Sequence, residues 1–431
     1  MKYISSSSEF GQKLLNRFIK YVKIWTESDS SIADAGTIPS TKRQFDFANL
    51  LKEELISIGL TNVQVTENCY VYALLPSTKP ENATSSLCLL AHMDTSEEVS
   101  GKDVNPLLHK NYDGKILQLN SDISINPQND SYLAKTANTS DTIITSDGST
   151  LLGADNKAGI AEIVTALEYL CNHKEIQHCA IEVVFSPDEE TGHGMDKVPM
   201  DLIKSKVAYT VDGGDLGQLE TECFNAASAT VTFTGKATHP GSAKESGMIN
   251  AILAAASFLE SLPKNELPET TEHYQGFYAP MDISSTVEKA EIHLILRDFD
   301  LDGLNKRIQF VKDLALNVEK QTKAKSSVET KYQYFNMKNE IEKSPDVVNK
   351  LKIAYNMSEV EPVLTPIRGG TDGSRLTEMG IPTPNIFTGG HNFHSRTEWA
   401  SLNQMCSATN VIINLVNISG DFSISFFILK Y

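Results

Sequence analysis

The feature that most constrains the fold of this chain is a series of short apolar runs, each closely followed by acidic or histidine residues. The runs and their clusters are Leu87–Ala91 with His92-Met93-Asp94, Ala180–Phe185 with Asp188-Glu189-Glu190, and Val207–Val211 with Asp212. Between the first two runs, after Gly153, apolar residues recur with a period of about 3.6, which predicts an amphipathic helix. Strand-like runs that alternate with helices favour an α/β fold, in which a mainly parallel sheet carries helices on both faces.

A fourth polar cluster, Asp155-Asn156, follows Gly153 at the start of this helix. Ligands bind at the carboxyl edge of open α/β sheets, so we expect the clusters to converge there. Three or more histidine, aspartate and glutamate side chains at one place form a divalent-metal site. The adjacent Glu189 and Glu190 offer a metal ligand beside a general base. The residues alone therefore indicate a metal-dependent hydrolase.

The pattern changes beyond about Thr221. Ala229, Val231 and Phe233 alternate with threonines, as in a half-buried antiparallel strand. From about Ser344 the α/β pattern resumes. We therefore expect a discontinuous catalytic domain, residues 1–222 and 339–431, with a small α+β lid domain, residues 223–338, inserted in it.

Two segments carry no clear pattern. Residues 100–147 are polar and indicate a long loop that can include a small hairpin. The C-terminal residues 421–429 form an apolar tail that is shorter than the roughly 20 residues a membrane-spanning helix needs. The pattern does not assign this tail to any element.

Composition excludes several classes of protein. The formal net charge of the 431 residues is -17, which argues against nucleic-acid binding because that requires clustered lysine and arginine. The N-terminus lacks the apolar core of a secretory signal, and no run is long enough to span a membrane. Six scattered cysteines indicate reduced thiols, and hence a cytoplasmic protein.

The candidate metal ligands are three carboxylates and two imidazoles: His92, Asp155, Glu190, Asp212 and His394. Two divalent ions about 3.5–4 Å apart lower the pKa of a water that they share. Glu189 can take the proton of this water and pass it to a leaving amine. Asp94, two residues after His92, is placed to orient that imidazole. The residues by themselves leave open which of Asp212 and Glu190 shares an ion with which histidine.

These motifs resemble the M20 family of dinuclear zinc peptidases, and more narrowly its tripeptide aminopeptidases. The matching segments are His92–Asp94, Gly153–Gly159, Ser186–Gly192, Asp212–Gly214, Glu222–Ala229, Gly235–Gly241, Leu296–Asp300 and Asn385–Gly390. The resemblance implies a zinc-peptidase-like catalytic domain with two zinc ions, for which cobalt or manganese can substitute. It implies that Asp155 bridges them, that His92 and Asp212 complete one ion, and that Glu190 and His394 complete the other. It further implies that Glu189 is the general base and Asp94 a supporting catalytic carboxylate.

The resemblance also implies substrate contacts in the lid. His239 would hydrogen-bond the developing oxyanion, and Arg297 and Arg368 would hold the carboxylate of the peptide. Asn225 lies in one of the matching segments and is a further substrate-binding candidate. The implied activity is release of the N-terminal residue from tripeptides by a water activated by two metals. Small peptides would be the partners, and many relatives are homodimers.

Several alternatives remain. A single aspartate or histidine after a strand is more often a turn or cap residue than a metal ligand. For the metal site to be absent, this interpretation would have to hold at all five positions at once, so the metal site is favoured. His391, three residues before His394, is the alternative ligand there. At the level of function, the alternatives are an M20 carboxypeptidase or N-acyl-amino-acid deacylase, or a catalytically silent metal-binding relative.

Overall fold

The computed structural model describes residues 1–79 and 86–420, so the predicted apolar tail lies outside the described residues. The chain divides into two compact units. Unit 1 comprises Met1–Thr221, Glu340–Thr365 and Thr371–Tyr431, and unit 2 comprises Glu222–Asn339 and Pro366–Gly370. Each unit has its own sheet and its own hydrophobic core.

An eight-stranded sheet forms the centre of unit 1. Its spatial order is β1 (Thr61–Val65), β2 (Val71–Leu75), β8 (Ala180–Ser186), β3 (Ser86–His92), β9 (Ala208–Gly213), β16 (Asn385–Phe387), β10 (Gln218–Glu220) and β15 (Val363–Leu364). Its central strands β8, β3, β9 and β16 are parallel, whereas β2 and β10 run antiparallel to their neighbours β8 and β16. The predicted α/β class is therefore confirmed.

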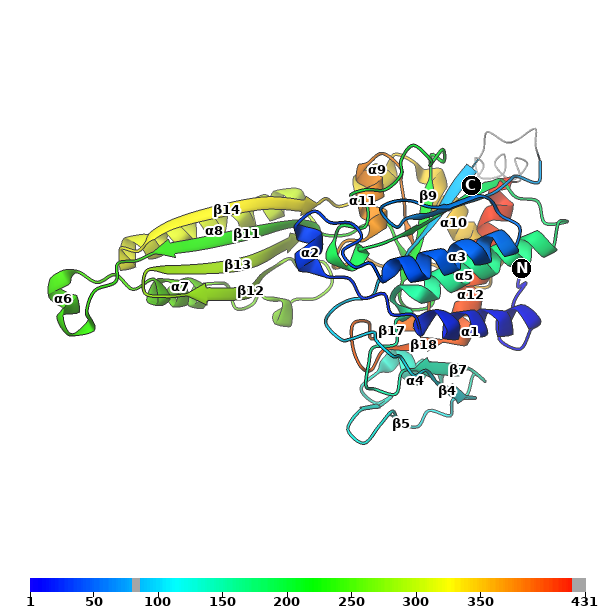
Figure 1. The fold of residues 1–431 in the computed structure, drawn as a ribbon, viewed down its shortest axis with the longest axis horizontal. Coiled ribbons are helices and arrows are strands. Elements are labelled where there is room, and N and C mark those ends of the chain that lie inside the picture. Colours follow the sequence, from blue (N-terminus) through cyan, green and yellow to red (C-terminus); the bar gives the residue numbers. More distant parts are fainter. Residues whose placement is uncertain (80–85, 421–431) are drawn as a thin grey trace. The chain divides into compact units, whose positions relative to one another are not determined.

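Helices cover both faces of this sheet because apolar residues alternate along its strands. Leu87 and Leu89 of β3 belong to the larger core, whereas Cys88 and Leu90 belong to a second core on the other face. The larger core is built with helices α1 (Glu9–Val22), α3 (Gln44–Ser57), α5 (Ala154–Asn172), α10 (Pro345–Met357) and α12 (Leu402–Gly420). The smaller core includes Leu376 of α11 (Asp372–Glu378). Figure 1 shows α1, α3 and α5 close to one another in unit 1.

Arg17 joins three of these helices through its guanidinium. From α1 it donates to Glu54 of α3 at 2.7 Å and to Thr165 and Glu168 of α5 at 2.6 and 2.7 Å. The Arg17 side chain is only 8% exposed, so its charge is balanced inside the helix layer rather than by solvent.

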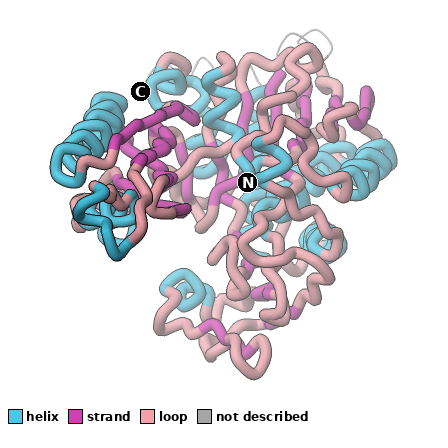
Figure 2. Tube along the Cα trace, turned by 60° about the vertical axis from the view of Figure 1, so that its left-hand side comes forward, coloured by secondary structure: helices cyan, strands magenta, loops and turns pink. Residues whose placement is uncertain are grey.

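The segment 100–147 contains more regular structure than the sequence predicts. It forms β4 (Leu107–Lys110), a hairpin of β5 (Leu117–Gln118) and β6 (Ser124–Ile125), helix α4 (Ser131–Thr136) and β7 (Thr142–Thr145). Strands β4 and β7 belong to a four-stranded sheet with β17 (Gly390–His391) and β18 (Trp399–Ser401). The predicted small hairpin is therefore present as β5 and β6, and much of the segment is loop, drawn pink in Figure 2, but β4, α4 and β7 are regular elements that the sequence does not predict.

Unit 2 is an antiparallel sheet packed against two helices. The strand order is β12 (Phe277–Ser285), β13 (Lys289–Asp298), β11 (Asn225–Thr234) and β14 (Lys325–Tyr334). Apolar side chains of β11 and β13 pack against α7 (Ala251–Glu260) and α8 (Leu301–Thr322). The three remaining α-helices among the described residues are short: α2 (Ser30–Asp34) in unit 1, α6 (Ala243–Ser246) in unit 2, and α9 (Lys338–Glu342), where the chain passes from unit 2 to unit 1.

Across the described ranges 1–79 and 86–420, the structure contains no helix that is both long and apolar enough to cross a membrane.

Candidate active site

The candidate site lies at the carboxyl edge of the parallel strands of unit 1. Strand β3 ends at His92, which pairs in parallel register with Ser186 at the end of β8. Asp212 is the next-to-last residue of the neighbouring strand β9. Glu189 and Glu190 follow β8 in a single 3-10 turn. The register of the sheet therefore brings three separate chain segments to one edge.

Asp155 lies between two histidines. Its Oδ1 is 2.9 Å from His92 Nε2, which is also 3.4 Å from Asp212 Oδ1. Its other oxygen, Oδ2, is 3.4 Å from His394 Nε2, and this nitrogen is 2.9 Å from Glu190 Oε2. The potential ligand atoms therefore form two groups, His92-Asp155-Asp212 and Asp155-Glu190-His394, whose atoms lie within 4.8 Å of one another in each group.

Both imidazoles are oriented by a partner on Nδ1. His92 Nδ1–H donates to the backbone carbonyl of Asp94 at 3.1 Å, and His394 Nδ1 is 3.2 Å from Glu98 Oε2. A bond at Nδ1 fixes the tautomer and leaves Nε2 available to a metal ion. Both Nε2 atoms face the shared Asp155.

Asp94 and Asp188 hold the turn that carries the two glutamates. The Asp94 carboxylate accepts from the backbone N–H groups of Glu189 and Glu190 at 3.0 and 3.2 Å. Asp188, which is completely buried, accepts from the Ser40 backbone N–H and the Gln44 side-chain amide, both at 2.6 Å. Both aspartates therefore fix the backbone from which Glu189 and Glu190 project.

Burial and neighbouring charge shift the pKa values in the site. Burial, followed by the charge of Asp155, raises the pKa of Glu190 to about 8. Burial also raises the pKa of Asp212 to about 6, against the lowering effect of His92. For Asp155, burial is outweighed by hydrogen bonds from His394 and His92, which lower its pKa. Burial raises the pKa of Glu189 well above its ordinary value, which suits a group that must hold and release a proton.

This donor set fits divalent cations. Imidazole nitrogens and carboxylate oxygens are the ligands that Zn²⁺ takes in proteins. Among the described residues, Glu190 Oε1 is buried and has no hydrogen-bond partner. A cation between these groups would offset the cost of crowding buried carboxylates.

The sequence did not single out two further buried carboxylates near the site. Asp372, at the start of α11, accepts a hydrogen bond from Ser186, and its charge affects the pKa of Glu189. Glu398 accepts backbone hydrogen bonds from the segment around Asp155. Neither follows a strand-like apolar run, so the pattern that revealed the candidate ligands does not reveal them.

His391 lies apart from both ligand groups. Its ring stacks on Trp399, with 3.9 Å between ring centroids, and its Nε2 is 3.1 Å from Gln404 Oε1. Burial lowers its pKa. The structure thus places His394, not His391, beside Asp155 and Glu190.

Three of the four lid residues proposed to bind substrate lie at one end of the unit 2 sheet or its connecting segments, and their polar groups have partners within unit 2. Asn225 is 4% exposed; its side-chain amide donates to the Phe299 carbonyl at 2.9 Å, and its oxygen accepts from the Asn336 N–H. Arg297 donates to Gln333 Oε1 at 2.9 Å. Arg368 donates to the backbone carbonyls of His273 and Gln275 at 2.7 and 3.0 Å.

His239, the fourth lid residue, lies at the opposite end of that sheet. Ala226 pairs with Arg297 at one end of β11, whereas Thr234 ends the strand on the other side. His239 follows Thr234 in the loop that leads to α6 (Figure 1), and its Nδ1 accepts from the Gly241 N–H. Ten residues of extended strand span about 30 Å, so His239 and Arg297 do not converge within one copy of unit 2.

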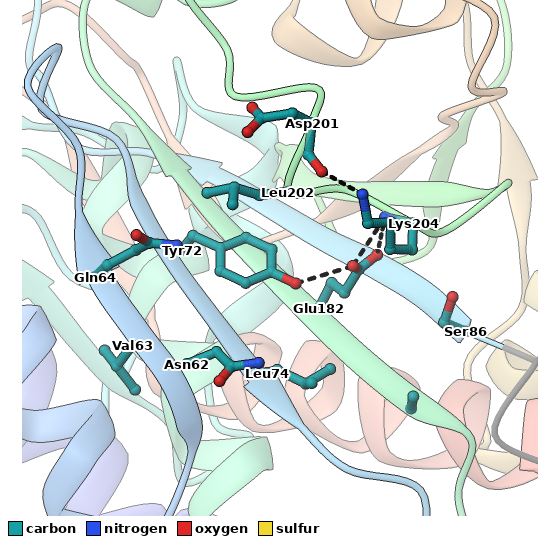
Figure 3. Close-up of a pocket in the computed structure, with 11 residues that line it drawn as sticks. Asn62, Val63, Gln64, Tyr72, Leu74, Ser86, Glu182, Asp201, Leu202 and Lys204 are labelled. Atoms are coloured by element: carbon teal, nitrogen blue, oxygen red, sulfur yellow. Dashed lines mark hydrogen bonds between the residues drawn. The ribbon is translucent and has the colours of Figure 1, made fainter.

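A cavity of about 630 Å³ lies elsewhere in unit 1, beside strands β1, β2 and β8 (Figure 3). The buried carboxylate in its lining, Glu182, accepts from the Tyr72 hydroxyl at 2.9 Å and from the backbone N–H groups of Lys204 and Ser205. These bonds tie strand β8 to β2 and to the segment before β9, which is a structural role.

Comparisons with known proteins agree with this geometry. Residues 146–418 match the model of peptidase family M20/M25/M40. The chain is 45% identical to peptidase T of Clostridium perfringens (strain SM101), over 94% of this chain and 99% of that protein.

Solved structures share the fold. Aminopeptidase PepT from Bacillus cereus has a TM-score of 0.72 at 20% identity, covering 95% of this chain and 99% of its own. A tripeptidase from Staphylococcus aureus has a TM-score of 0.74 at 21% identity, covering 95% and 98%. A dinuclear metal-binding M20 peptidase from Bacillus subtilis has a TM-score of 0.65 at 13% identity, covering 95% and 98%. With a family model matched over most of its length and a relative of such high identity, this chain belongs to peptidase family M20/M25/M40 and is a peptide hydrolase.

Proposed function

We propose that the protein is an aminopeptidase that releases the N-terminal residue from tripeptides and uses two zinc ions, with cobalt or manganese as possible substitutes. The observation that carries this proposal is the position of Asp155, whose two oxygens face two separate histidine–carboxylate groups. In the proposed site His92, Asp155 and Asp212 hold one ion, and Asp155, Glu190 and His394 hold the other. Peptidase T, PepT and tripeptidase relatives support the tripeptide substrate.

Bound divalent ions would supply Lewis acidity, which activates water and polarises the peptide carbonyl. Glu189 would accept the proton from the attacking water and deliver it to the amine that leaves. Its raised pKa favours a carboxyl that can hold this proton between the two steps. Asp94 would support both roles, because it orients His92 and binds the Glu189 and Glu190 N–H groups.

For the substrate, we propose that Arg297 contacts the C-terminal carboxylate of the peptide directly. Arg368 and Asn225 would contribute mainly through the backbone segments that they hold, because their polar groups already bind carbonyls and N–H groups of unit 2. His239, which is exposed, would donate to the developing oxyanion.

The distance between His239 and Arg297 supports a homodimer. A tripeptide spans about 10 Å, whereas these two residues lie at opposite ends of a ten-residue strand. Both can serve one substrate only if they come from two copies of the chain. The edge strand β12, with Met281 63% exposed and Ile283 48% exposed, is a surface suited to such an assembly.

Mixing two inactive variants tests this assembly. We expect His239→Ala and Glu189→Ala each to be nearly inactive alone. After the two are unfolded and refolded together, mixed dimers should recover a fraction of wild-type activity, since one of their two sites would then be intact. If the mixture stays as inactive as its components, His239 acts in its own chain or not at all.

Hydrolysis of Ala-Ala-Ala compared with its N-acetylated form tests the reaction itself. An aminopeptidase must recognise the free N-terminal amine, so we expect release of alanine from the free peptide and little cleavage of the blocked one. Equal cleavage of both, or cleavage of the blocked peptide only, would contradict the aminopeptidase proposal and favour an M20 carboxypeptidase or deacylase. No hydrolysis of either peptide by metal-loaded protein would favour a catalytically silent relative.

The state of the cysteines supports a cytoplasmic location. All six belong to the described residues, none of them forms a disulfide there, and five are buried. Free thiols without any disulfide pairing are typical of proteins that work in a reducing compartment.

A further inference from the structure

Glu398 is a buried carboxylate whose hydrogen bonds all go to the segment that carries Asp155. It is 1% exposed and lies just before strand β18. Its Oε2 accepts from the backbone N–H groups of Leu152 and Gly153 at 2.7 and 2.8 Å, and its Oε1 accepts from the N–H of Asp155 at 3.1 Å. One side chain therefore binds three N–H groups at the start of α5.

A carboxylate suits this position for two reasons. The first N–H groups of a helix have no partner within the helix, and negative charge at this end is stabilising. Of the three N–H groups, only that of Asp155 lies in α5, whose N-cap residue Gly153 has no side chain that could bind it. From another part of the chain, Glu398 therefore binds one N–H group in the first turn of α5 and the N–H groups of the two residues just before the helix.

The same loop that carries Glu398 also carries His394. The loop joins β17 to β18, whose pairing places His391 opposite Trp399. Within it, the Glu398 N–H donates to the Ser395 carbonyl at 3.3 Å, and the Asn392 side-chain amide donates to the Thr397 carbonyl at 3.3 Å. The position of His394 is thus linked through this loop to the position of Glu398.

We propose that Glu398 is a positioning residue that locks the Asp155 segment to the His394 loop and so sets the spacing of the two metal-ligand groups. This inference rests on the proposed function, in which Asp155 and His394 are metal ligands. Glu398 touches neither substrate nor metal in this account and acts only through the backbone of Asp155.

The variant Glu398→Gln isolates the bond to Asp155. Its amide oxygen can still accept from Leu152 and Gly153, so the variant should fold. Its NH₂ group, however, would face the Asp155 N–H, and two donors cannot bond. We expect its affinity for Zn²⁺, measured by competition with a chromophoric chelator, to fall by about 10–100-fold. The visible absorption of the Co²⁺-loaded form should also change, because the coordination geometry at Asp155 changes.

Glu162→Gln is the matched control. Glu162 is also a completely buried glutamate of unit 1, but it lies in the middle of α5, and within the described residues its carboxyl oxygens make no hydrogen bond. We expect Glu162→Gln to keep wild-type Zn²⁺ affinity and Co²⁺ absorption. Equal Zn²⁺ affinity and identical Co²⁺ spectra for Glu398→Gln and this control would overturn the inference.

A second variant covers the case in which Glu398→Gln does not fold. Glu398→Asp keeps the charge but is one methylene too short to reach all three N–H groups, so it should also bind Zn²⁺ more weakly than wild type. Wild-type affinity in Glu398→Asp would contradict the inference. If the wild-type protein itself binds no divalent metal, the proposed function fails instead, so the two failures are distinguishable.

Discussion

At the scale of single residues, carboxylates that are not candidate ligands hold the site together. Asp94 binds the N–H groups of Glu189 and Glu190, and Glu398 binds the N–H of Asp155. The donors in these bonds are backbone N–H groups, which most substitutions leave in place. The bonds therefore depend on the acceptors, which are the side chains of a few acidic residues. In the proposed site, each of them would position a ligand or the base rather than contact the substrate.

Glu189→Ala tests the proposed base. The variant removes only the carboxyl group, while the Asp94 hydrogen bonds go to the backbone and remain. We expect Zn²⁺ stoichiometry and thermal stability close to wild type, and kcat for Ala-Ala-Ala lower by about 10²–10⁴-fold. Wild-type kcat in this variant would refute the assigned mechanism.

Glu162 is a residue whose burial costs stability. It is completely buried, and within the described residues neither of its carboxyl oxygens has a hydrogen-bond partner. Burial raises its pKa well above the ordinary value. The folded protein therefore keeps Glu162 protonated at pH values where the unfolded chain releases this proton.

The sign of the resulting pH dependence follows directly. Between the ordinary glutamate pKa and the raised one, the folded state binds more protons than the unfolded state, so stability falls as pH rises. Relative to Glu162→Gln, wild type should lose up to about 1.4 kcal/mol per pH unit as the pH rises from the ordinary glutamate pKa toward the raised one. Urea unfolding of both proteins across this range measures the difference. A difference that does not change with pH would show that Glu162 has an ordinary pKa.

At the scale of elements, close approach of a helix to a strand shapes the site. Gly159 of α5 lies against β9, and a β-carbon there would overlap the Val211 carbonyl oxygen. Val211 precedes Asp212 in the same strand. The absence of a side chain at position 159 therefore allows α5, which carries Asp155 in its first turn, to lie beside the strand that carries Asp212.

Gly159→Ala should separate these two elements. We expect a loss of about 1–3 kcal/mol in the free energy of unfolding, as is usual for overpacking, together with weaker Zn²⁺ binding. Gly369→Ala is the control, because a β-carbon at 369 would have no neighbour within 4 Å. Unchanged stability and metal affinity in Gly159→Ala would mean that α5 can shift without disturbing Asp212.

The local sequence pattern was sufficient to predict helices and strands whose apolar residues recur regularly within one segment. The period of 3.6 in 160–170 predicted α5, and the run 87–91 predicted β3, which the structure extends to His92. Strands β4 and β7 were missed because each is four residues long and β7 pairs with β18, more than 250 residues later. Pairing between strands so far apart in sequence depends on the tertiary structure, and a short stretch of sequence does not contain this information.

At the scale of the whole molecule, the chain passes between the two units more often than the sequence pattern predicts, since that pattern indicates a single inserted segment. The change from α/β to antiparallel character near Thr221 is visible in sequence. Five residues, Pro366–Gly370, belong to unit 2 although residues on both sides belong to unit 1. These five residues include Arg368, which bonds to carbonyls of His273 and Gln275 nearly a hundred residues earlier. A segment this short has no periodicity that could reveal its partner.

The same contrast holds for the site. His92, Asp212 and the two glutamates follow or end strands and Asp155 lies at a helix start, so pattern alone singled them out, whereas His394, in a loop, was proposed with the help of the family resemblance. Glu398 and Asp372 were not singled out, because their roles depend on which backbone or side chain they reach after folding. Sequence therefore predicted the proposed ligands and base more readily than the buried carboxylates that bond to the segments around them.

Titration of the metal-free protein with Zn²⁺ tests the central claim most directly. Calorimetry would give the number of ions bound per chain, and hydrolysis of Ala-Ala-Ala would be measured at each addition. The account predicts no activity without metal and a plateau in activity when two ions are bound per chain. Full activity in the metal-free protein, or a plateau at one ion per chain, would contradict it.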